Sequence, residues 1–504
     1  MAVLAALLSA CAVGPNYRTP RVPLPRAFDA APAASGGGPS TPAAARPAAV
    51  DPASWWRSLG DPLLDSLVER AVRSNLDLEV ALDRLQEARM REAVVLGGAL
   101  PEVGVSAGGG LGTGRNATRG RTGPGLNAAT NPRSLSRVDW AAGFDAVWEL
   151  DVFGKYRREI EASRYDTEAA IEARGAVLVT VVADVVRAYL DMRGLQIELS
   201  VARQAVEADR RSRDLVRSRY LGGFTNALDL ALAERELAAA QARVAPLAAR
   251  VSAAQDTVAL LLGTYPEEVR KELETPRALP PIPPDVQPGL PIDLLRRRPD
   301  IRQAERQLAA ATARIGVATA DLFPRISVNA AVGLQHPAPA EGGQGIWSAG
   351  PFGMWNLLDF GQLDALVSIA DLRTRAQFAE YRATILRAVG EVDTAATAYQ
   401  AQRDRLRNLE DALAASHEAV RLANQRYDRG LTDYLNVLDA ERQEFDLEDQ
   451  YGVAQAATAD QFVALYKALG GGWEGYQAIP PIRRPRPAVI AAFARLFSGD
   501  EPQK

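Results

Sequence analysis

Apolar residues recur at helical spacing over unusually long stretches of this chain. One such stretch begins near Gly154 and runs to Tyr220 without an internal Pro or a run of Gly. At 1.5 Å per residue it predicts a helix of roughly 100 Å, far longer than the helices of ordinary globular domains. Gly222 and Gly223 then predict a chain reversal, and a helix of about half that length returns over residues 226–262.

The second half of the chain shows the same scheme. Its pattern predicts a short helix over 299–322, a very long helix over 362–427 and, after Gly430, a returning helix over 432–469. A further helix is predicted from Asp61-Pro62 to Gly97, because an N-cap carboxylate followed by Pro is a favourable helix start. In each half two shorter helices can therefore stack end to end beside a long one, which predicts a tall, narrow helical wall.

Alternating apolar and polar residues predict strands between the short and the long helix of each half. These strands cover residues 101–110 and 139–150 in the first half, and 325–334 and 346–355 in the second. Each is about 10 residues long, enough to cross a bilayer obliquely, with aromatic residues placed as interfacial anchors. Four strands cannot close a barrel, and lipid does not tolerate open edges. Transmembrane strands would therefore require the chain to oligomerise, and three chains would give twelve strands, an even number wide enough to leave a lumen. The alternative is two solvent-exposed hairpins on a soluble rod.

The two halves are related by a repeat of 207 residues. The segment Arg219-Tyr220-Leu221-Gly222-Gly223-Phe224-Thr225 matches Arg426-Tyr427-Asp428-Arg429-Gly430-Leu431-Thr432, and the same offset relates Trp148 to Trp355. It also relates Phe153-Gly154 to Phe360-Gly361 and Glu234-Arg235 to Glu441-Arg442. A common offset at turns, strand ends and helix ends indicates a duplicated architecture. The first repeat is expected over 61–290, with its hairpin at about 101–150. The second is expected over 291–473, with its hairpin at about 325–356, followed by a tail over 474–504.

Composition argues against several classes of function. The formal net charge of −4 gives no basic stripe for nucleic acid, and 2 His with 4 Met give no metal cluster. The run Gly104-Val105-Ser106-Ala107-Gly108 matches a hydrolase motif but lacks the helix and His partner which that chemistry needs. No nucleotide-binding loop is present, so a partner would have to supply energy. We therefore expect no enzymatic activity, no cofactor and no metal.

The N-terminus indicates a lipid anchor. The run Leu8-Ser9-Ala10-Cys11 follows a short apolar stretch and is similar to a bacterial lipoprotein signal, in which the Cys is lipidated, for example with palmitate. Residues 1–10 would be the signal peptide, although they lack the usual basic region, so we expect the true start codon to lie upstream. Residues 11–60 would be the lipidated tether, extended or mobile over its Ala/Pro/Gly-rich part. The alternative is a stray Cys in a short apolar N-terminus.

Several runs of this chain are specific when taken together: Cys11-Ala12-Val13-Gly14-Pro15-Asn16-Tyr17, Trp55-Trp56, Leu295-Arg296-Arg297-Arg298-Pro299-Asp300-Ile301, Leu322-Phe323-Pro324, Trp355-Asn356-Leu357-Leu358-Asp359-Phe360-Gly361 and the stretch from Arg426 to Ala440. In these runs the chain resembles the outer membrane factor family, the TolC-type ducts, and within it the NodT-like efflux lipoproteins. The resemblance implies a homotrimer with a twelve-stranded barrel in the outer membrane and a helical tunnel in the periplasm. It also implies a passive, gated duct that exports small molecules such as drugs, receiving them from an inner-membrane RND-type pump through a periplasmic adaptor.

The resemblance also implies a gate at the periplasmic end. The helix-reversal tips Gly222, Gly223 and Gly430 would form the entrance. Carboxylates would favour cations there, and the candidates are Asp229, Asp433 and Asp439. Arg426 and Tyr427 would hold the gate through interhelical hydrogen bonds, while Thr432 stands where some members carry Arg. The alternatives are a duct for type I protein secretion or metal-ion export, and a non-transporting structural envelope lipoprotein.

Overall fold

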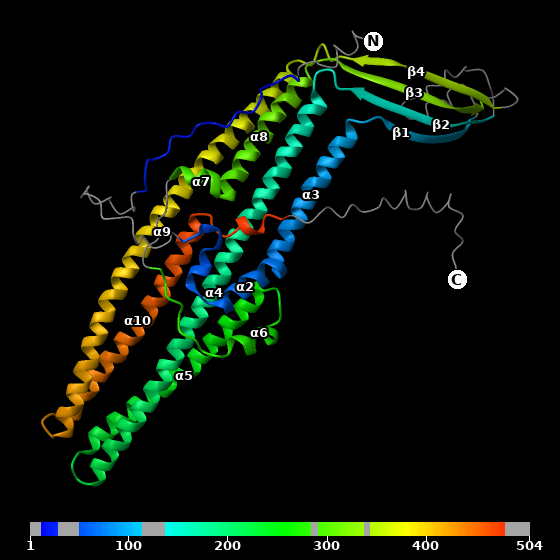
Figure 1. The fold of residues 1–504 in the computed structure, drawn as a ribbon. Coiled ribbons are helices and arrows are strands. Elements are labelled where there is room, and N and C mark those ends of the chain that lie inside the picture. The colour runs from blue at the N-terminus through cyan, green and yellow to red at the C-terminus, as the bar shows by residue number, and fades with distance from the viewer. Residues whose placement is uncertain (1–11, 29–49, 113–136, 284–290, 337–342, 479–504) are drawn as a thin grey trace, which may run out of the picture.

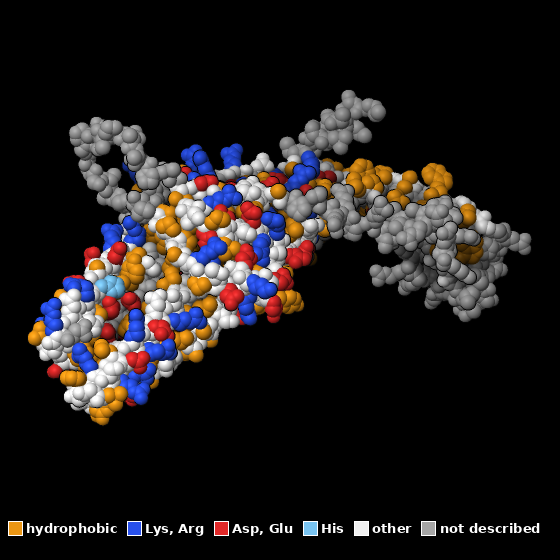
Figure 2. Space-filling view, turned by 60° about the horizontal axis from the view of Figure 1, so that its bottom comes forward, with side chains coloured by type: hydrophobic (Ala, Val, Ile, Leu, Met, Phe, Trp, Pro, Cys, Tyr) orange, Lys and Arg blue, Asp and Glu red, His pale blue; other side chains and the backbone are white. Residues whose placement is uncertain are grey.

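The computed structural model describes residues 12–28, 50–112, 137–283, 291–336 and 343–478. Cys11 and the tail after residue 478 lie outside these ranges. The molecule is an elongated helical body with a sheet at one end and two helical hairpin tips at the other (Figure 1). On the face shown in Figure 2, charged side chains are scattered over the helical body, whereas hydrophobic side chains gather on the described part of the sheet end.

The predicted pairing of long and short helices is confirmed. Two helices of 67 residues each, α4 (Lys155–Leu221) and α9 (Gln362–Asp428), run along the body. Beside α4 lie α3 (Leu76–Gly98) and α5 (Ala227–Leu261). Beside α9 lie α8 (Pro299–Ala320) and α10 (Tyr434–Ala468). Because α4 also packs against α8 and α10, the two halves form one body.

The predicted single helix from Asp61 to Gly97 is wrong, because the structure divides it into two. Helix α2 (Pro62–Ser74) ends at Asn75, whose backbone N–H donates to Ala71 at 2.8 Å. The Asn75 side chain then caps α3 by accepting from the Asp77 N–H at 3.0 Å. Its amide also donates to the Leu261 carbonyl at 2.8 Å, which fixes the bend against the end of α5. A single Asn thus ends one helix and begins the next.

Short elements that periodicity did not predict surround the middle of the body. They are the 3-10 helices η1 (Pro52–Leu59) and η2 (Glu474–Tyr476) and the helices α6 (Pro266–Leu273) and α7 (Pro291–Arg297). The main core lies here, where Trp55 is fully buried and stacks on Tyr466 with ring centroids 5.2 Å apart. Every described helix is too short or too polar to serve as a membrane-spanning helix.

The predicted hairpins are confirmed, and they join into one sheet. Strands β1 (Glu102–Gly112), β2 (Arg137–Leu150), β3 (Arg325–His336) and β4 (Gln344–Met354) are antiparallel neighbours in that order. Between the halves, β2 pairs with β3 from Leu150 opposite Ile326 to Trp140 opposite His336. Strands β1 and β4 are therefore the two edges of the sheet.

The expected loose tether does not describe residues 12–28, which have no regular secondary structure but lie against the body. The buried Arg158 side chain on α4 donates to the carbonyls of Val13 and Gly14 at 3.0 and 3.1 Å and to Asn16 Oδ1 at 2.8 Å. Further along the segment, Phe28 is buried in the main core. Specific contacts therefore hold residues 12–28 against the body, although their Pro-rich, Ala-rich composition predicts a loose tether.

Candidate functional site

The two helix reversals share one geometry at the same end of the molecule (Figure 1). Gly223 and Gly430 have φ of +75° and +68°, the left-handed conformation that favours Gly after a helix. At each reversal the N–H two residues after the cap donates to a helix carbonyl at 2.9 Å, from Phe224 to Arg219 and from Leu431 to Arg426. Gly222 has a helical φ of −81°, so its backbone conformation does not require Gly.

A small apolar cluster joins the two hairpins just behind these tips. It consists of Val216, Ala233, Tyr427, Tyr434, Val437 and Leu438. The Tyr434 hydroxyl lies 2.9 Å from Ser212 Oγ, which links α10 to α4. The Arg219 guanidinium lies over the Tyr427 ring at 4.3 Å from its centroid, which links α4 to α9. The tips are therefore held together by aromatic contacts.

Of the two predicted gate-holding residues, Tyr427 lies at the contact between hairpins and Arg426 does not. The Tyr427 side chain is buried, and its hydroxyl has no hydrogen-bond partner among the described residues. Its contacts with the other hairpin include Arg219, whose guanidinium lies over the Tyr427 ring and donates to the Tyr427 carbonyl at 3.5 Å. The Arg426 side chain is exposed on the last turns of α9.

The three predicted carboxylates occupy different environments. Asp229 is partly buried in the first turn of α5, where Thr225 Oγ1 donates to it and its own N–H donates to Asn226. Asp433 is the exposed N-cap of α10, and its side chain makes no capping hydrogen bond. Asp439 is exposed and accepts from Gln443 Nε2 at 3.1 Å. Asp229 is thus tied into its turn, whereas Asp433 and Asp439 face solvent in the single chain.

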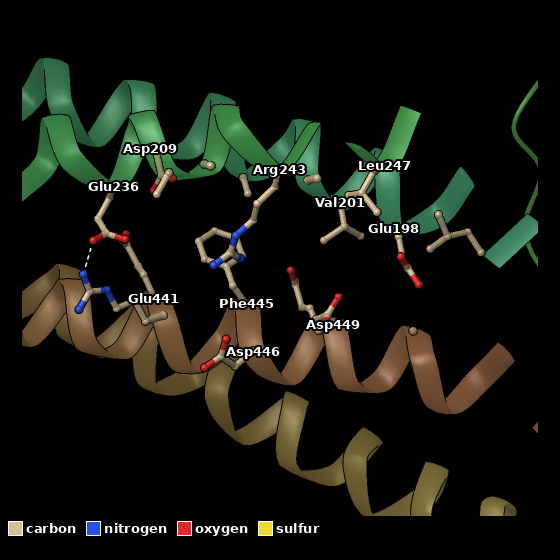
Figure 3. Close-up of a pocket in the computed structure, with 18 of the residues that line it drawn as sticks. Glu198, Val201, Asp209, Glu236, Arg243, Leu247, Glu441, Phe445, Asp446 and Asp449 are labelled. Atoms are coloured by element: carbon tan, nitrogen blue, oxygen red, sulfur yellow. Dashed lines mark hydrogen bonds and ion pairs between the residues drawn. The ribbon is translucent and has the colours of Figure 1, made fainter. Parts of the chain in front are cut away.

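Behind the tips, an acidic cleft that the sequence analysis missed separates the two hairpins (Figure 3). It has a volume of about 400 Å³ and lies between α4, α5 and α10. Two arginines, Arg243 and Arg442, line it together with seven carboxylates. Those carboxylates are Glu198, Asp209, Glu236, Glu441, Asp446, Glu448 and Asp449.

One ion pair crosses the cleft at its tip-side end. Arg442 on α10 donates to Glu236 on α5, which also pairs with Arg235 at 2.7 Å (Figure 3). The hydrogen bond from Arg442, opposed by burial and helped by Arg235, holds the pKa of Glu236 below its usual value. Glu236 therefore stays ionised and links the two hairpins electrostatically.

Two other cleft carboxylates are shifted in the opposite direction. Burial and the charge of Glu236, opposed by Arg243, raise the pKa of Asp209 on α4 to about 6. Burial and the charge of Asp209 raise the pKa of Glu441 on α10 to about 7, against a hydrogen bond with Asn424. Removing charged groups from water favours their neutral form. These two side chains therefore change charge between mildly acidic and neutral pH.

The sequence alone indicated only part of this acidic cleft. The repeat aligns Glu441 with Glu234, yet Glu234 is exposed on α5 and Glu441 is partly buried. A polar residue on a long amphipathic helix is normally assigned to solvent, because periodicity does not show which face a second hairpin covers.

Comparisons with known proteins agree with this architecture. Residues 67–264 and 290–471 match the family model described as outer membrane efflux protein. Nodulation protein T of Rhizobium leguminosarum bv. viciae is 30% identical over 505 residues, covering 99% of this chain and 98% of that relative. The toluene efflux pump outer membrane protein TtgF of Pseudomonas putida is 30% identical, covering 95% of this chain and 97% of its own.

A solved structure shows the same fold. The outer-membrane channel OprN superposes with a TM-score of 0.79 at 36% sequence identity, covering 92% of this chain and 100% of that one.

Proposed function

We propose, from the premise that this chain belongs to the outer membrane efflux protein family, that it is a passive duct for small apolar or amphipathic molecules such as drugs or solvents. The chain is an outer membrane channel that extends into the periplasm, and it is not an enzyme. The family match, over most of the chain, carries this conclusion. The substrate class is supported by the relatives: one is described as a toluene efflux pump protein, and another, 29% identical, as an antibiotic efflux pump protein.

The duct works as a homotrimer whose twelve strands close into one barrel in the outer membrane. The free edges of the single chain support this. The sheet ends in the unpaired edge strands β1 and β4, which cannot remain open in lipid. On the body, α9 leaves Leu366, Ile369 and Leu372 exposed, while α3 leaves Val80 and Val94 exposed. A neighbouring copy would cover both apolar faces.

Its periplasmic partners are an adaptor protein and an inner-membrane pump of the RND type. The efflux-pump relatives support a multipart pump, and the absence of a nucleotide-binding loop from the sequence supports an external energy source. The helical tips lie farthest from the sheet and are therefore the end that an adaptor would meet (Figure 1).

The gate lies at the tips, where Gly222, Gly223 and Gly430 reverse the chain. Tyr427 holds it through its contact with Arg219, whereas Arg426, exposed in the single chain, holds it through contacts with a neighbouring copy. Asp433 and Asp439, supported by Asp229, favour cations. The exposure of Asp433 and Asp439 beside the reversals supports this selectivity role. The aromatic contact of Tyr427 with Arg219 supports a closed resting position of the tips.

Cys11 carries the lipid anchor. The docked segment after it supports this, because the Val13 N–H donates to the Phe153 carbonyl at 3.2 Å. Phe153 lies three residues after the end of β2 at Leu150, so residue 12 lies beside the base of the sheet. A lipid attached there would enter the leaflet next to the strands.

Single-channel recording of the purified, lipidated protein in a planar bilayer, with its mass in detergent, tests the function. A trimer with small, cation-favouring currents that grow in gate variants is expected. A monomer that never conducts would overturn the proposal.

A further inference from the structure

A second cavity lies where α10 ends and α8 begins. It has a volume of about 740 Å³ and is lined by residues of α4, α8, α9 and α10 of a single chain. Helices α8 and α10 follow one another along the body between α4 and α9 (Figure 1). This cavity, which we call the junction cavity, is therefore complete in one copy of the chain.

The junction cavity lies on the face of the helices opposite the main core. On α10, Gln461, Ala464 and Lys467 line it, whereas Phe462 and Tyr466 are buried in the main core. Positions that alternate in this way point to opposite sides of a helix. The main core also takes in residues of the short elements η1, α2 and α6. Those elements therefore cover the other face and leave the face with the cavity uncovered.

Basic side chains from all four surrounding elements line the junction cavity. They are Arg187 on α4, Arg298 at the N-cap of α8, Arg387 on α9 and Lys467 on α10. Two carboxylates, Asp300 and Glu391, also line it. Four positive charges against two negative charges leave the lining with an excess of two positive charges.

Arg298 engages both of these carboxylates. Its Nη1 donates to Glu391 and its Nη2 to Asp300, each at 2.7 Å, and Nη1 also donates to the Ala468 carbonyl at 2.8 Å. Arg298 is buried, so these bonds tie α8, α9 and α10 together. Arg298 and the two carboxylates thus serve as a structural link, and the other three basic residues remain to meet a ligand.

Two of those three have carboxylate partners outside the cavity lining. Arg187 Nε lies 3.2 Å from Asp460 Oδ1, and Lys467 Nζ lies 3.1 Å from Asp184 Oδ1. Both are pairs between α4 and α10. They hold the two basic groups at the rim of the cavity without placing a carboxylate in its lining.

Arg387 is the basic residue best placed to bind a ligand. Its Nη2 is 3.9 Å from Glu380, longer than a hydrogen bond, and its side chain is 60% exposed. A guanidinium can bind a carboxylate or sulfonate through two parallel hydrogen bonds. Small apolar side chains, including Ala176, Val179 and Ala464, line the same cavity. This combination suits an anion that also carries an apolar group.

We propose that the junction cavity binds small amphipathic anions, whose carboxylate or sulfonate group is held by Arg387 and Lys467 while the apolar part packs on Val179 and Ala464. Helix α10 has 35 residues, so its end at the cavity lies roughly 50 Å from the tips and the predicted gate. This inference deepens the proposed function and rests on it, since the uncovered face of the helices lines the duct along which such molecules pass.

Equilibrium binding of a matched pair of fluorescent probes tests the need for a negative charge. Dansylglycine carries a carboxylate, whereas dansylamide has the same apolar ring system without it. With the full chain in lipid nanodiscs, and the signal of empty nanodiscs subtracted, dansylglycine is expected to bind about ten-fold more tightly, the effect of a charge-assisted hydrogen bond. Equal affinities for the two probes would overturn the assignment to anions.

Removing two positive charges tests the residues. Arg387→Gln with Lys467→Gln is expected to weaken dansylglycine binding by about ten-fold and to leave dansylamide binding nearly unchanged. The charge-matched control is Arg375→Gln with Arg407→Gln, because each of these exposed arginines pairs with an Asp of its own helix and neither lines the cavity. Equal loss of dansylglycine binding in the two double variants would overturn the site.

Filling the cavity tests its location without changing a charge. Gly390 on α9 lines the cavity, and a Cβ at this position meets no neighbouring atom within 4 Å. Gly390→Leu should therefore fold and still weaken dansylglycine binding several-fold; unchanged binding would overturn the site. A trimer that conducts but binds no dansylglycine overturns the site and leaves the proposed function intact. A chain that binds the probe but never conducts overturns the duct and leaves the site intact.

Discussion

Asp209 on α4 and Glu441 on α10 face one another across the acidic cleft, one from each helical hairpin (Figure 3). Burial and the charge of Asp209 raise the pKa of Glu441. Holding the hairpins together therefore favours a proton on this pair, and moving them apart into water favours its loss.

The first prediction is that rising pH loosens the tips. The pKa of each carboxyl is raised in the packed state, so the packed state binds more protons and loses stability as pH rises from about 4 to about 7. Channel conductance should grow several-fold over this window. Asp209→Asn with Glu441→Gln should flatten the profile, while Asp433→Asn at an exposed site should leave its midpoint unchanged. A steep profile in the double variant would exclude this pair as its cause.

The second prediction concerns the ion pair that crosses the cleft. Arg442→Ala removes the hydrogen-bonded partner of Glu236. It should weaken the free energy that holds the two hairpins together by about 0.5–1 kcal/mol, a small value because the pair is partly exposed. Conductance should rise modestly. Arg235→Ala is the control, since Arg235 and Glu236 belong to the same hairpin. Charge exchange, Glu236→Arg with Arg442→Glu, should restore low conductance; failure to do so would argue against a direct role of the pair.

The third prediction concerns ion selectivity. Asp433→Ala with Asp439→Ala should weaken the cation preference of the reconstituted pore, because both carboxylates are exposed beside the reversal. Asp229→Ala should have a smaller effect on selectivity, since Thr225 already engages that carboxylate. Reversal potentials in a salt gradient measure the preference. Unchanged selectivity in the double variant would remove Asp433 and Asp439 from the constriction.

The long elements could be predicted from sequence because local signals define them. The N-cap Asp61 and the left-handed Gly223 act on residues next to them, and the 67 residues of α4 contain neither a Pro nor a run of Gly that would end the helix. The break at Asn75 depends on the Leu261 carbonyl, a partner almost two hundred residues away. No local pattern contains that contact.

The features of the candidate site also fall into those that local sequence predicts and those that depend on distant contacts. Gly223 and Gly430 were predictable because a left-handed φ after a helix is a local requirement. The acidic cleft was not, since the burial of Asp209 and Glu441 depends on how one hairpin packs against the other. The docking of residues 12–28 likewise depends on Arg158, which composition does not reveal.

The last prediction is that the N-terminal segment is locked by close backbone packing at Gly14. Gly14 has φ of +89°, and a Cβ there would lie 2.4 Å from Gly316 Cα, a backbone atom that cannot yield cheaply. Gly14→Ala should therefore release the segment and make it sensitive to protease. Gly60→Ala is the matched control: its φ is +66°, but a Cβ there meets no atom within 4 Å, so it carries the conformational cost alone. Arg158→Ala should act like Gly14→Ala, because it removes the hydrogen bonds from Arg158 to the Val13 and Gly14 carbonyls and to Asn16, each worth about 0.5–1.5 kcal/mol. Equal protease resistance of the Gly14 and Gly60 variants would show that the packing against Gly316 does not hold the segment.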